Sequence, residues 1–384
     1  MRILYLNHDQ NRTGTTIALV NILQGMVKRG HEVFVIKPCG EGFLEEKLRK
    51  EGIPFISLPL RCMAYPQTKN IFYRLKSISG LIWRKLSIQN AIEKIIQDFN
   101  PDIIHTNSGL LDVALTPCLK MHKPHIWHIR EAAETLGLYP FPSSSYYNRR
   151  LQNEGNYNIA VSHFVFNYRK LRPSKDIVIY DGVFSKSNTI YPVRKEKTIL
   201  YIGAITEYKG VATLLHAFCK FHQQYPSFKL SLIGQVTKQN ESFYYACLAF
   251  IERNNLQACV TFLGSRNNTY ELISKASAVV VPTFHEGFGF VTAEAMLNKT
   301  FVIGRDSAGT KEQMDICKKE TGLELAYRFS SQEDLVKGLC YVAKNDTSVL
   351  CEKARLVVLE KYSVEENCTR IENFYKWVLK DYYG

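Results

Sequence analysis

Short apolar segments alternate with amphipathic segments from one end of the 384-residue chain to the other. Strands that alternate with helices form parallel sheets covered by helices on both faces. Eleven apolar segments are predicted to be buried strands: Ile3–Asn7, His31–Lys37, Ile53–Leu58, Asp102–Thr106, His125–Ile129, Tyr157–Val161, Thr198–Gly203, Phe228–Gly234, Cys259–Gly264, Ala278–Pro282 and Phe301–Gly304. Helical patterns separate or follow them, among them Thr16–Arg29, Ile71–Asp98, Ser162–Leu171, Leu335–Lys344 and Val364–Leu379. The pattern therefore predicts an α/β protein.

The strands fall into two series, separated by the polar segment 180–197, which contains Asp-Gly and Pro192 and is typical of a linker. We therefore expect two doubly wound, Rossmann-like domains, residues 1–185 and 186–363. The C-terminal helix, at about 364–384, is expected to pack back on the first domain. Because ligands bind at the carboxyl ends of such strands, we expect the two domains to face each other across a cleft.

The charge balance and the cysteines narrow the class of protein. Lys and Arg number 49 and Asp and Glu 36, a net charge of +13 that favours an anionic partner. The sequence lacks a helix-turn-helix, RRM or OB pattern, so nucleic acid is not expected. The ten cysteines include no CxxC pair, which fits a reducing cytoplasm. No apolar run approaches the roughly 18–20 residues that span a bilayer, and the start turns polar too early for a signal peptide.

One segment lacks acidic residues altogether, from Gly52 to Ile92. Apolar residues, among them Trp83, are interleaved with six cations. The cations are Arg61, Lys69, Arg74, Lys76, Arg84 and Lys85. A basic amphipathic helix with a tryptophan is typical of a membrane-surface element. This interpretation predicts attachment of residues 61–90 to the anionic inner face of the membrane. The alternative is an ordinary helix whose apolar stripe packs in the core.

The most informative motif is the segment 282–296, a glycine-containing loop between a predicted strand and a predicted helix. Glu286 lies in the loop and Glu294 lies one to two turns into the helix. Glycines let the backbone approach a ligand, and a helix start offers free N–H groups to an anion. Two carboxylates at such different depths suit two sets of hydroxyls on one elongated ligand. The alternative is a helix start with an acidic first turn, which periodicity alone favours.

Glu286 and Glu294 form an E-x7-E element with Gly-Phe-Gly after the first Glu, and other short elements precede and follow it in a fixed order. These are Tyr201-Ile202-Gly203, Lys209-Gly210, Leu232-Ile233-Gly234, Phe262-Leu263-Gly264 and Ala308-Gly309-Thr310-Lys311-Glu312. Together they resemble the retaining GT-B glycosyltransferases of family 4 over about residues 198–325, and the N-terminal half matches more loosely. The resemblance implies a retaining enzyme that moves a sugar from a nucleoside diphosphate-sugar to a glycan or lipid-linked acceptor, in surface polysaccharide biosynthesis.

The resemblance also implies a role for each matching residue. Lys209 would face the diphosphate, Glu286 would hold hydroxyls of the donor sugar, and His128 would lie near the reacting carbon. Glu294 would bind the ribose hydroxyls, and the other implied donor-binding residues are Gly287, Phe288, Gly289, Phe290, Gly14, Gly203 and Arg266. Arg130 and His105 are expected on the acceptor side.

Departures from the family pattern leave alternatives open. Family members carry an arginine directly after the strand glycine, whereas this chain has Ala204. Either another residue such as Arg130 or Arg266 supplies that charge, or the diphosphate binds more weakly. The usual Asn-Gly-Val before the second domain is Asp181-Gly182-Val183. One alternative is a GT-B sugar-nucleotide epimerase. Another is a non-catalytic subunit that binds nucleotide-sugars, which the replacement of the usual arginine by Ala204 suggests.

Neither a metal nor another cofactor is expected. Three histidines, at 122, 125 and 128, are spaced like metal ligands, but strand alternation places His128 beside Arg130 and His125 beside Trp127, on opposite faces. The chain also lacks an Asp-x-Asp motif for a metal-bound nucleotide. In the first loop only Gly14 matches the family's glycines. There Thr15 or Thr16 could simply cap the helix that follows.

Overall fold

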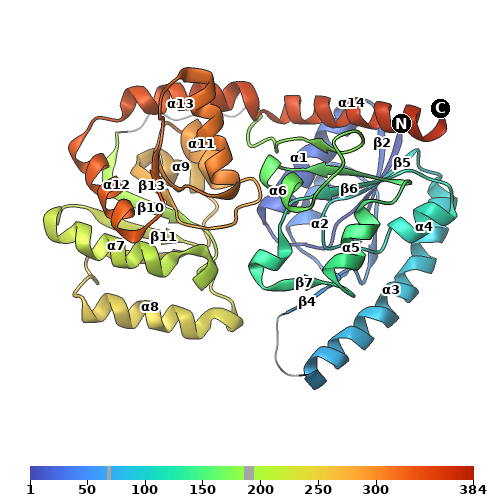
Figure 1. The fold of residues 1–384 in the computed structure, drawn as a ribbon, viewed down its shortest axis with the longest axis horizontal. Helices are drawn as coiled ribbons and strands as arrows, with labels where there is room; N and C mark the ends of the chain where they lie inside the picture. Colours follow the sequence, from blue (N-terminus) through green and yellow to red (C-terminus); the bar gives the residue numbers. More distant parts are fainter. Residues whose placement is uncertain (67–70, 186–193) are drawn as a thin grey trace. The chain divides into compact units, whose positions relative to one another are not determined.

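The computed structural model describes residues 1–66, 71–185 and 194–384, except for the side chains of residues 66, 71–78, 81–84, 133 and 136 (Figure 1). The chain divides into two compact units. We call Met1–Lys186 with Ser363–Gly384 the N-terminal unit, and Ser187–Tyr362 the C-terminal unit. Each contains a parallel sheet with helices on its faces, so the prediction of two Rossmann-like α/β domains is confirmed.

The N-terminal unit is built on a seven-stranded sheet with the order β3-β2-β1-β5-β6-β8-β9, in which every pair is parallel. Its strands are β1 (Arg2–Leu6), β2 (Glu32–Pro38), β3 (Phe55–Leu58), β5 (Ile103–Thr106), β6 (His125–Ile129), β8 (Asn156–Ala160) and β9 (Ile177–Val178). The six predicted strands of this half are all present. The two-residue edge strand β9 was not predicted, because so short a segment carries no periodicity.

Helices of the N-terminal unit are α1 (Gly14–Lys28), α2 (Phe43–Lys50), α3 (Ile71–Phe99), α4 (Leu115–Lys120), the 3₁₀ turn η1 (Ala133–Leu136), α5 (Ser144–Leu151), α6 (His163–Tyr168) and α14 (Val364–Tyr383). The last of these, α14, is formed by the C-terminal end of the chain and packs against α1 (Figure 1). Its buried residues Ile371, Tyr375 and Val378 repeat every three to four positions and join the core around β1 and β5. The C-terminal helix is thus part of the first unit.

Helix α3 contains most of the segment without acidic residues. Its later turns place Ile88, Ile92 and Ile96 in the core at the i, i+4 spacing of one helix face. A small antiparallel sheet, β4 (Ala64–Pro66) with β7 (Leu138–Pro140), was not predicted, because three-residue strands with proline read as loops.

The C-terminal unit has a six-stranded parallel sheet with the order β12-β11-β10-β13-β14-β15. Its strands are β10 (Glu196–Ile202), β11 (Lys229–Ile233), β12 (Val260–Gly264), β13 (Ala276–Val281), β14 (Phe301–Arg305) and β15 (Tyr327–Phe329). Its helices are η2 (Glu207–Lys209), α7 (Val211–Gln224), η3 (Lys238–Asn240), α8 (Glu241–Arg253), α9 (Thr269–Lys275), α10 (Phe290–Leu297), α11 (Ala308–Thr321), α12 (Gln332–Lys344) and α13 (Ser348–Lys361). Five of the strands were predicted, and the three-residue edge strand β15 was not.

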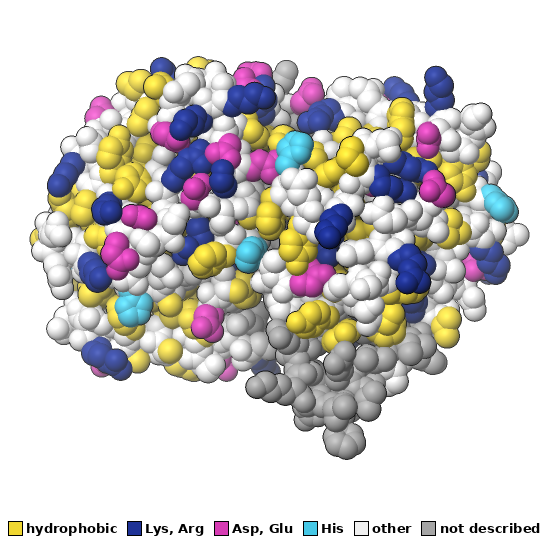
Figure 2. Space-filling model, viewed as in Figure 1, with side chains coloured by type: hydrophobic (Ala, Val, Ile, Leu, Met, Phe, Trp, Pro, Cys, Tyr) yellow, Lys and Arg dark blue, Asp and Glu magenta, His cyan; other side chains and the backbone are white. Residues whose placement is uncertain are grey.

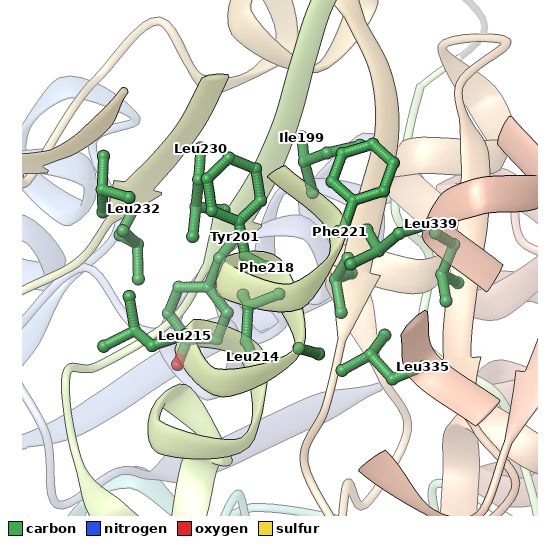
Figure 3. Packing of buried hydrophobic residues seen from close by; sticks show 14 of the residues in the cluster. Ile199, Tyr201, Leu214, Leu215, Phe218, Phe221, Leu230, Leu232, Leu335 and Leu339 are labelled. Atoms are coloured by element: carbon green, nitrogen blue, oxygen red, sulfur yellow. The ribbon is translucent and has the colours of Figure 1, made fainter. Parts of the chain in front are cut away.

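Figure 3 shows the core that holds this second sheet. Side chains of α7, including Phe218 and Phe221, lie against Ile199 of β10 and Leu230 of β11, and α12 adds Leu335 and Leu339. The labelled leucines and phenylalanines are nearly all fully buried. Such packing fixes the sheet rigidly, and so fixes where its loops begin.

Of the predicted membrane-binding segment, residues 67–70 and most of the cationic and apolar side chains of α3 lie outside the described residues. Among those described, Leu86 is 61% exposed. Lys85, in contrast, forms an ion pair with Asp112 at 2.6 Å. On the face shown in Figure 2, described Lys and Arg side chains are interspersed with Asp and Glu. Among the described helices, none combines the length and apolar character needed to cross a membrane.

Candidate functional site

The E-x7-E element lies at the carboxyl ends of adjacent strands in the C-terminal unit. Strand β13 leads into the loop that carries Glu286, and its neighbour β10 leads into the turn η2 that carries Lys209. The sheet order therefore brings together two residues that are 77 positions apart. Lys209 Nζ donates a hydrogen bond to Glu286 Oε1 at 2.7 Å. Each of these side chains keeps about a fifth of its surface exposed, 23% and 22%.

The Lys209–Glu286 pair is charged despite its depth. Burial opposes ionisation of Glu286, but Lys209 and the Thr283 hydroxyl outweigh it and lower the pKa of the carboxyl. Burial likewise favours a neutral Lys209, yet Glu286 raises the pKa of the amine. Each partner therefore stabilises the charged form of the other. A cation held in this way at the end of a sheet can bind a phosphate oxygen, while the carboxylate can accept hydroxyl hydrogens.

Close backbone packing fixes the loop from Pro282 to Gly289. Gly210, which precedes α7, has φ +76°, and a Cβ there would lie 2.6 Å from the Pro282 carbonyl oxygen. On the other side Gly309 donates its N–H to the Glu286 carbonyl, at 2.9 Å. A Cβ on Gly309 would meet the Gly287 carbonyl oxygen at 2.6 Å. Glycine is required at both positions because the chains approach too closely for a side chain.

Side chains at the end of β14 and in α11 complete this support. Gln313 Nε2 donates to the carbonyls of Phe288 and Gly289, at 2.6 and 3.0 Å. Arg305 Nε donates to the Pro282 carbonyl at 2.9 Å, and its guanidinium stacks on Phe284. Sequence reasoning missed Gln313 and Arg305. The only signal was that the Ala308–Glu312 element recurs in the resemblance.

Gly289, with φ +92°, precedes α10, which begins at Phe290. Glu294 lies about one turn further along α10 and is half-buried. The first N–H groups of α10 lack acceptors within the helix, so this start can bind an anion. Phe288 is buried, whereas Gly287 and Phe290 are partly exposed. Five of the predicted donor-binding residues, Gly287 to Phe290 and Glu294, thus lie in one continuous loop and helix start.

Two other predicted residues of this unit lie at the same edge of the sheet. Gly203 directly follows β10, and Arg266 follows β12 and is exposed. The backbone is crowded beside Gly203, because a Cβ there would lie 2.7 Å from the Tyr201 hydroxyl. A Cβ on Gly234 would lie 1.7 Å from the Gly203 carbonyl oxygen. The next residue, Ala204, is half-buried and accepts a hydrogen bond from the Tyr201 hydroxyl at its carbonyl.

In the N-terminal unit, His105 lies in β5 and His128 lies in β6, and both are fully buried. His105 Nε2 lies 3.2 Å from His128 Nδ1, and His105 Nδ1 lies 2.5 Å from the Tyr375 hydroxyl. Burial lowers the pKa of both imidazoles well below the usual value, and Arg130 acts in the same direction. Both nitrogens of His105 are therefore engaged inside the protein. It therefore has no nitrogen left for an acceptor, whereas the equally buried His128 keeps Nε2 without a hydrogen-bond partner among the described residues.

Arg130, just after β6, is also occupied within the unit. Its Nη1 donates to Asp181 at 2.6 and 2.7 Å, and its Nε and Nη2 donate to Asn107 Oδ1 at 3.1 and 2.8 Å. Arg130 is only 7% exposed. The expectation that it replaces the missing arginine at 204 therefore loses support, because its charge is compensated by Asp181. Sequence reasoning noted Asp181 as a departure from the family pattern but missed this pairing.

Strand alternation correctly predicted which side chains of the segment 125–130 lie together. His128 Nδ1 lies 3.5 Å from Arg130 Nη2, and the His125 ring packs against the Trp127 ring. Gly14 is the first residue of α1. The helix cap, however, is Thr13, whose side chain accepts from the Thr16 N–H, and not Thr15 or Thr16. Thr13 is held there by a hydrogen bond from its hydroxyl to Asp9. Among the described residues, no cluster of three His, Cys, Asp or Glu could hold a metal ion.

Comparisons with known proteins agree that both halves of the chain match glycosyltransferase families. Residues 12–183 match the family described as Glycosyltransferase Family 4, and residues 186–356 match Glycosyl transferases group 1. An uncharacterized glycosyltransferase of Methanocaldococcus jannaschii is 25% identical over 62% of this chain and 64% of its own length. The chain thus spans less than two thirds of that relative.

A lipopolysaccharide core biosynthesis mannosyltransferase of Rhizobium leguminosarum is 25% identical over 47% of this chain and 50% of its own. Among solved structures, the Anabaena protein HepE in complex with UDP superposes with a TM-score of 0.74 at 18% identity. That match covers 98% of this chain and all of the other, and it shows the fold.

Proposed function

The chain belongs to the GT-B glycosyltransferases of family 4 and group 1, and on that premise we propose that it transfers a sugar, with retention, from a nucleoside diphosphate-sugar to a glycan or lipid-linked acceptor. The ion pair between Lys209 and Glu286 is the observation that carries the proposal. It holds one cation and one carboxylate at neighbouring strand ends, beside the helix start of α10. A nucleotide-sugar needs both groups, because its diphosphate is anionic and its sugar carries hydroxyls.

In the proposed reaction, Lys209 contacts the diphosphate. As the bond to the sugar breaks, negative charge grows on the leaving nucleoside diphosphate, and a fixed cation stabilises that charge more in the transition state than in the ground state. The rigid loop from Glu286 to Phe290 holds the donor sugar, and Glu294 accepts hydrogen bonds from the ribose. His128 contacts the sugar near its reacting carbon. Because the site offers no clear nucleophile, we propose a same-face displacement in which the leaving phosphate takes the acceptor proton.

We further propose that the reaction needs no divalent ion. The support is that Lys209 and the first N–H groups of α10 can take over the neutralising role, and that the sequence lacks Asp-x-Asp. For the acceptor, the names of relatives in lipopolysaccharide biosynthesis favour a growing surface glycan. A lipid-linked acceptor would also explain the basic segment 61–90 as a peripheral attachment to the cytoplasmic face of the membrane.

A panel of labelled nucleotide-sugars, offered with and without membrane lipid extract, tests the proposal. Transfer of label that stops in Glu294→Ala, with the fold intact, supports it. Glu294→Gln is the matched variant, because the amide keeps the shape but accepts weaker hydrogen bonds. Epimerised donor without transfer would identify the epimerase alternative. Binding without turnover would identify a non-catalytic subunit, which Ala204 still favours.

A further inference from the structure

A chain of buried hydrogen bonds runs from the C-terminal helix to His128. The Tyr5 hydroxyl lies 2.9 Å from the Tyr375 hydroxyl, which lies 2.5 Å from His105 Nδ1. The other ring nitrogen of His105 lies 3.2 Å from His128 Nδ1. All four side chains are fully buried, and they come from β1, α14, β5 and β6.

Arg130 determines which atoms donate and which accept in this series of hydrogen bonds. Its guanidinium lies 3.5 Å from His128 Nδ1, and a guanidinium can only donate. A proton on His128 Nδ1 would point at that cation, so Nδ1 is an acceptor. His105 must then donate from Nε2, and its Nδ1 must accept from the Tyr375 hydroxyl. Tyr375 in turn accepts from Tyr5. The single lone pair of His128 Nδ1 accepts from His105, and the longer contact with Arg130 acts through its charge. The reverse arrangement would join the same four side chains but would point the Nδ1–H at the guanidinium, so the first arrangement is favoured.

The neutral His128 that results carries its proton on Nε2. This nitrogen is buried and has no hydrogen-bond partner among the described residues. A buried donor without a partner is costly and therefore rare in folded proteins. Burial also keeps both imidazoles uncharged and both tyrosines protonated, since it lowers the first pair of pKa values and raises the second. The His128 Nε2–H is thus a neutral hydrogen-bond donor of fixed orientation that no described residue accepts from.

We propose that Tyr5, Tyr375 and His105 are positioning residues that hold His128 in its Nε2–H tautomer, so that it serves as a neutral hydrogen-bond donor to the ligand and not as a base. The inference rests on the proposed function for the identity of that ligand, a nucleotide-sugar. It makes the C-terminal helix α14 part of the site's support, because Tyr375 is the residue that fixes His105.

Long-range ¹H–¹⁵N spectra of the full chain labelled at histidine test the tautomer without any assay of activity. The His128 signals are identified by their loss in His128→Gln. We expect a protonated Nε2 and an unprotonated Nδ1 in the wild type. We expect a population of the other tautomer in Tyr375→Phe, where His105 Nδ1 loses its donor. A protonated Nδ1 in the wild type would overturn the proposal, whether or not the protein transfers sugar.

Kinetics with the donor that the panel of nucleotide-sugars identifies supply the second readout. Tyr375→Phe should lower kcat roughly ten-fold with little change in KM, because misorientation of one donor affects the reacting geometry more than binding. The matched control is Tyr157→Phe, which removes another tyrosine hydroxyl bonded to α14, at Asp381, outside the chain of hydrogen bonds. Equal losses in the two variants would contradict the proposal.

His105→Gln against His105→Leu provides a rescue test, because glutamine can both accept from Tyr375 and donate to His128 whereas leucine can do neither. Retained kcat and tautomer in the glutamine variant alone supports the relay. If Tyr375→Phe fails to fold, Tyr5→Phe replaces it. That change keeps the Tyr375 donor, and a smaller shift of the same sign is expected. Identical behaviour of His105→Gln and His105→Leu in a folded protein would overturn the relay.

Discussion

The carboxyl ends of the two parallel sheets differ in how their polar groups are satisfied. In the N-terminal unit, Asn107, His128, Arg130 and Asp181 are each at most 7% exposed, and they contact one another or neighbouring side chains. In the C-terminal unit, the Lys209–Glu286 pair stays about a fifth exposed and is flanked by glycines at 203, 210, 287 and 289. The same architecture therefore ends in a closed polar network in one unit and in an accessible ion pair in the other.

Because of this difference, we expect the two sheet edges to respond differently to mutation and to ligands. A closed, buried network resists change, because removal of one member leaves the others unsatisfied. An accessible ion pair can exchange partners with a ligand at little cost to the fold. We therefore expect mutations and pH to act mainly on stability in the N-terminal unit, apart from the tautomer of His128, and mainly on ligand binding in the C-terminal unit.

The largest expected effect is the loss of Asp181. In Asp181→Ala the Arg130 guanidinium remains buried without its counter-ion, which should destabilise the N-terminal unit by about 3–5 kcal/mol. All three tryptophans belong to this unit, so urea unfolding followed by tryptophan fluorescence measures it selectively. The control is Asp315→Ala in the C-terminal unit, whose ion pairs are partly exposed and should contribute under about 1 kcal/mol. Because that unit contains no tryptophan, circular dichroism follows its unfolding. Equal effects would remove the contrast between the units.

Mild acid should have an effect of similar size on the same unit. Burial lowers the pKa of His125 to about 3, and lowers those of His105 and His128 well below 6.5. Because the pKa values of these histidines are lower in the folded state than in the unfolded state, the unfolded state binds more protons in acid. Their contribution to the free energy of unfolding is therefore complete above about pH 6.5 and is lost as the pH falls below that value. At pH 5.5 each neutral imidazole costs about 1.4 kcal/mol, or about 4 kcal/mol together.

The Lys209–Glu286 pair provides the contrast. The lowered pKa of Glu286 means that its contribution is present above about pH 4.5 and is lost only as the pH falls through the lower folded value. Urea unfolding followed by tryptophan fluorescence should therefore show that the N-terminal unit has a much smaller free energy of unfolding at pH 5.5 than at pH 7.5. A pH-independent midpoint in the N-terminal unit would show that its histidines are not held neutral.

Next in size is the loss of the accessible cation. Lys209→Ala should lower kcat/KM about 100-fold, as expected for a group that stabilises charge in the transition state. It should weaken binding of a nucleoside diphosphate but barely change binding of the nucleoside, measured by calorimetry. Lys311→Ala, at a half-exposed lysine paired with Asp315 on α11, is the control. Equal losses of affinity for nucleoside and diphosphate would take Lys209 away from the phosphates.

Sequence reasoning predicted the open edge better than the closed one, for a physical reason. Lys209, Glu286 and Glu294 lie in segments whose order follows the strands, so a parallel sheet and a resemblance suffice to place them together. The closed edge depends on contacts between side chains of distant segments. Tyr375 meets His105 across 270 positions, and Asp181 meets Arg130 across 51. Nothing in the local pattern at Tyr375 distinguishes a core tyrosine from a positioning one.

The smallest effect is expected from restoring the arginine that family members carry at position 204. Arg130 is neutralised by Asp181 and Arg266 lies after the edge strand β12, so neither supplies a second cation next to Lys209 along β10. Ala204→Arg should therefore tighten diphosphate binding by about two- to five-fold, as a partly exposed charge contributes roughly 0.5–1 kcal/mol. Ala204→Gln is the matched control, since it adds length and hydrogen bonds without charge.

The gain in Ala204→Arg should shrink as salt rises, because a Debye length of about 8–10 Å at moderate ionic strength already screens an exposed charge. An equal gain in Ala204→Gln would show that added contacts, and not charge, are what the edge lacks. A loss in both variants would show that the crowded backbone between Gly203 and Gly234 cannot accept a longer side chain. In that case the open edge functions with Lys209 as its main cation, and the departure at position 204 reflects packing and not a weakened site.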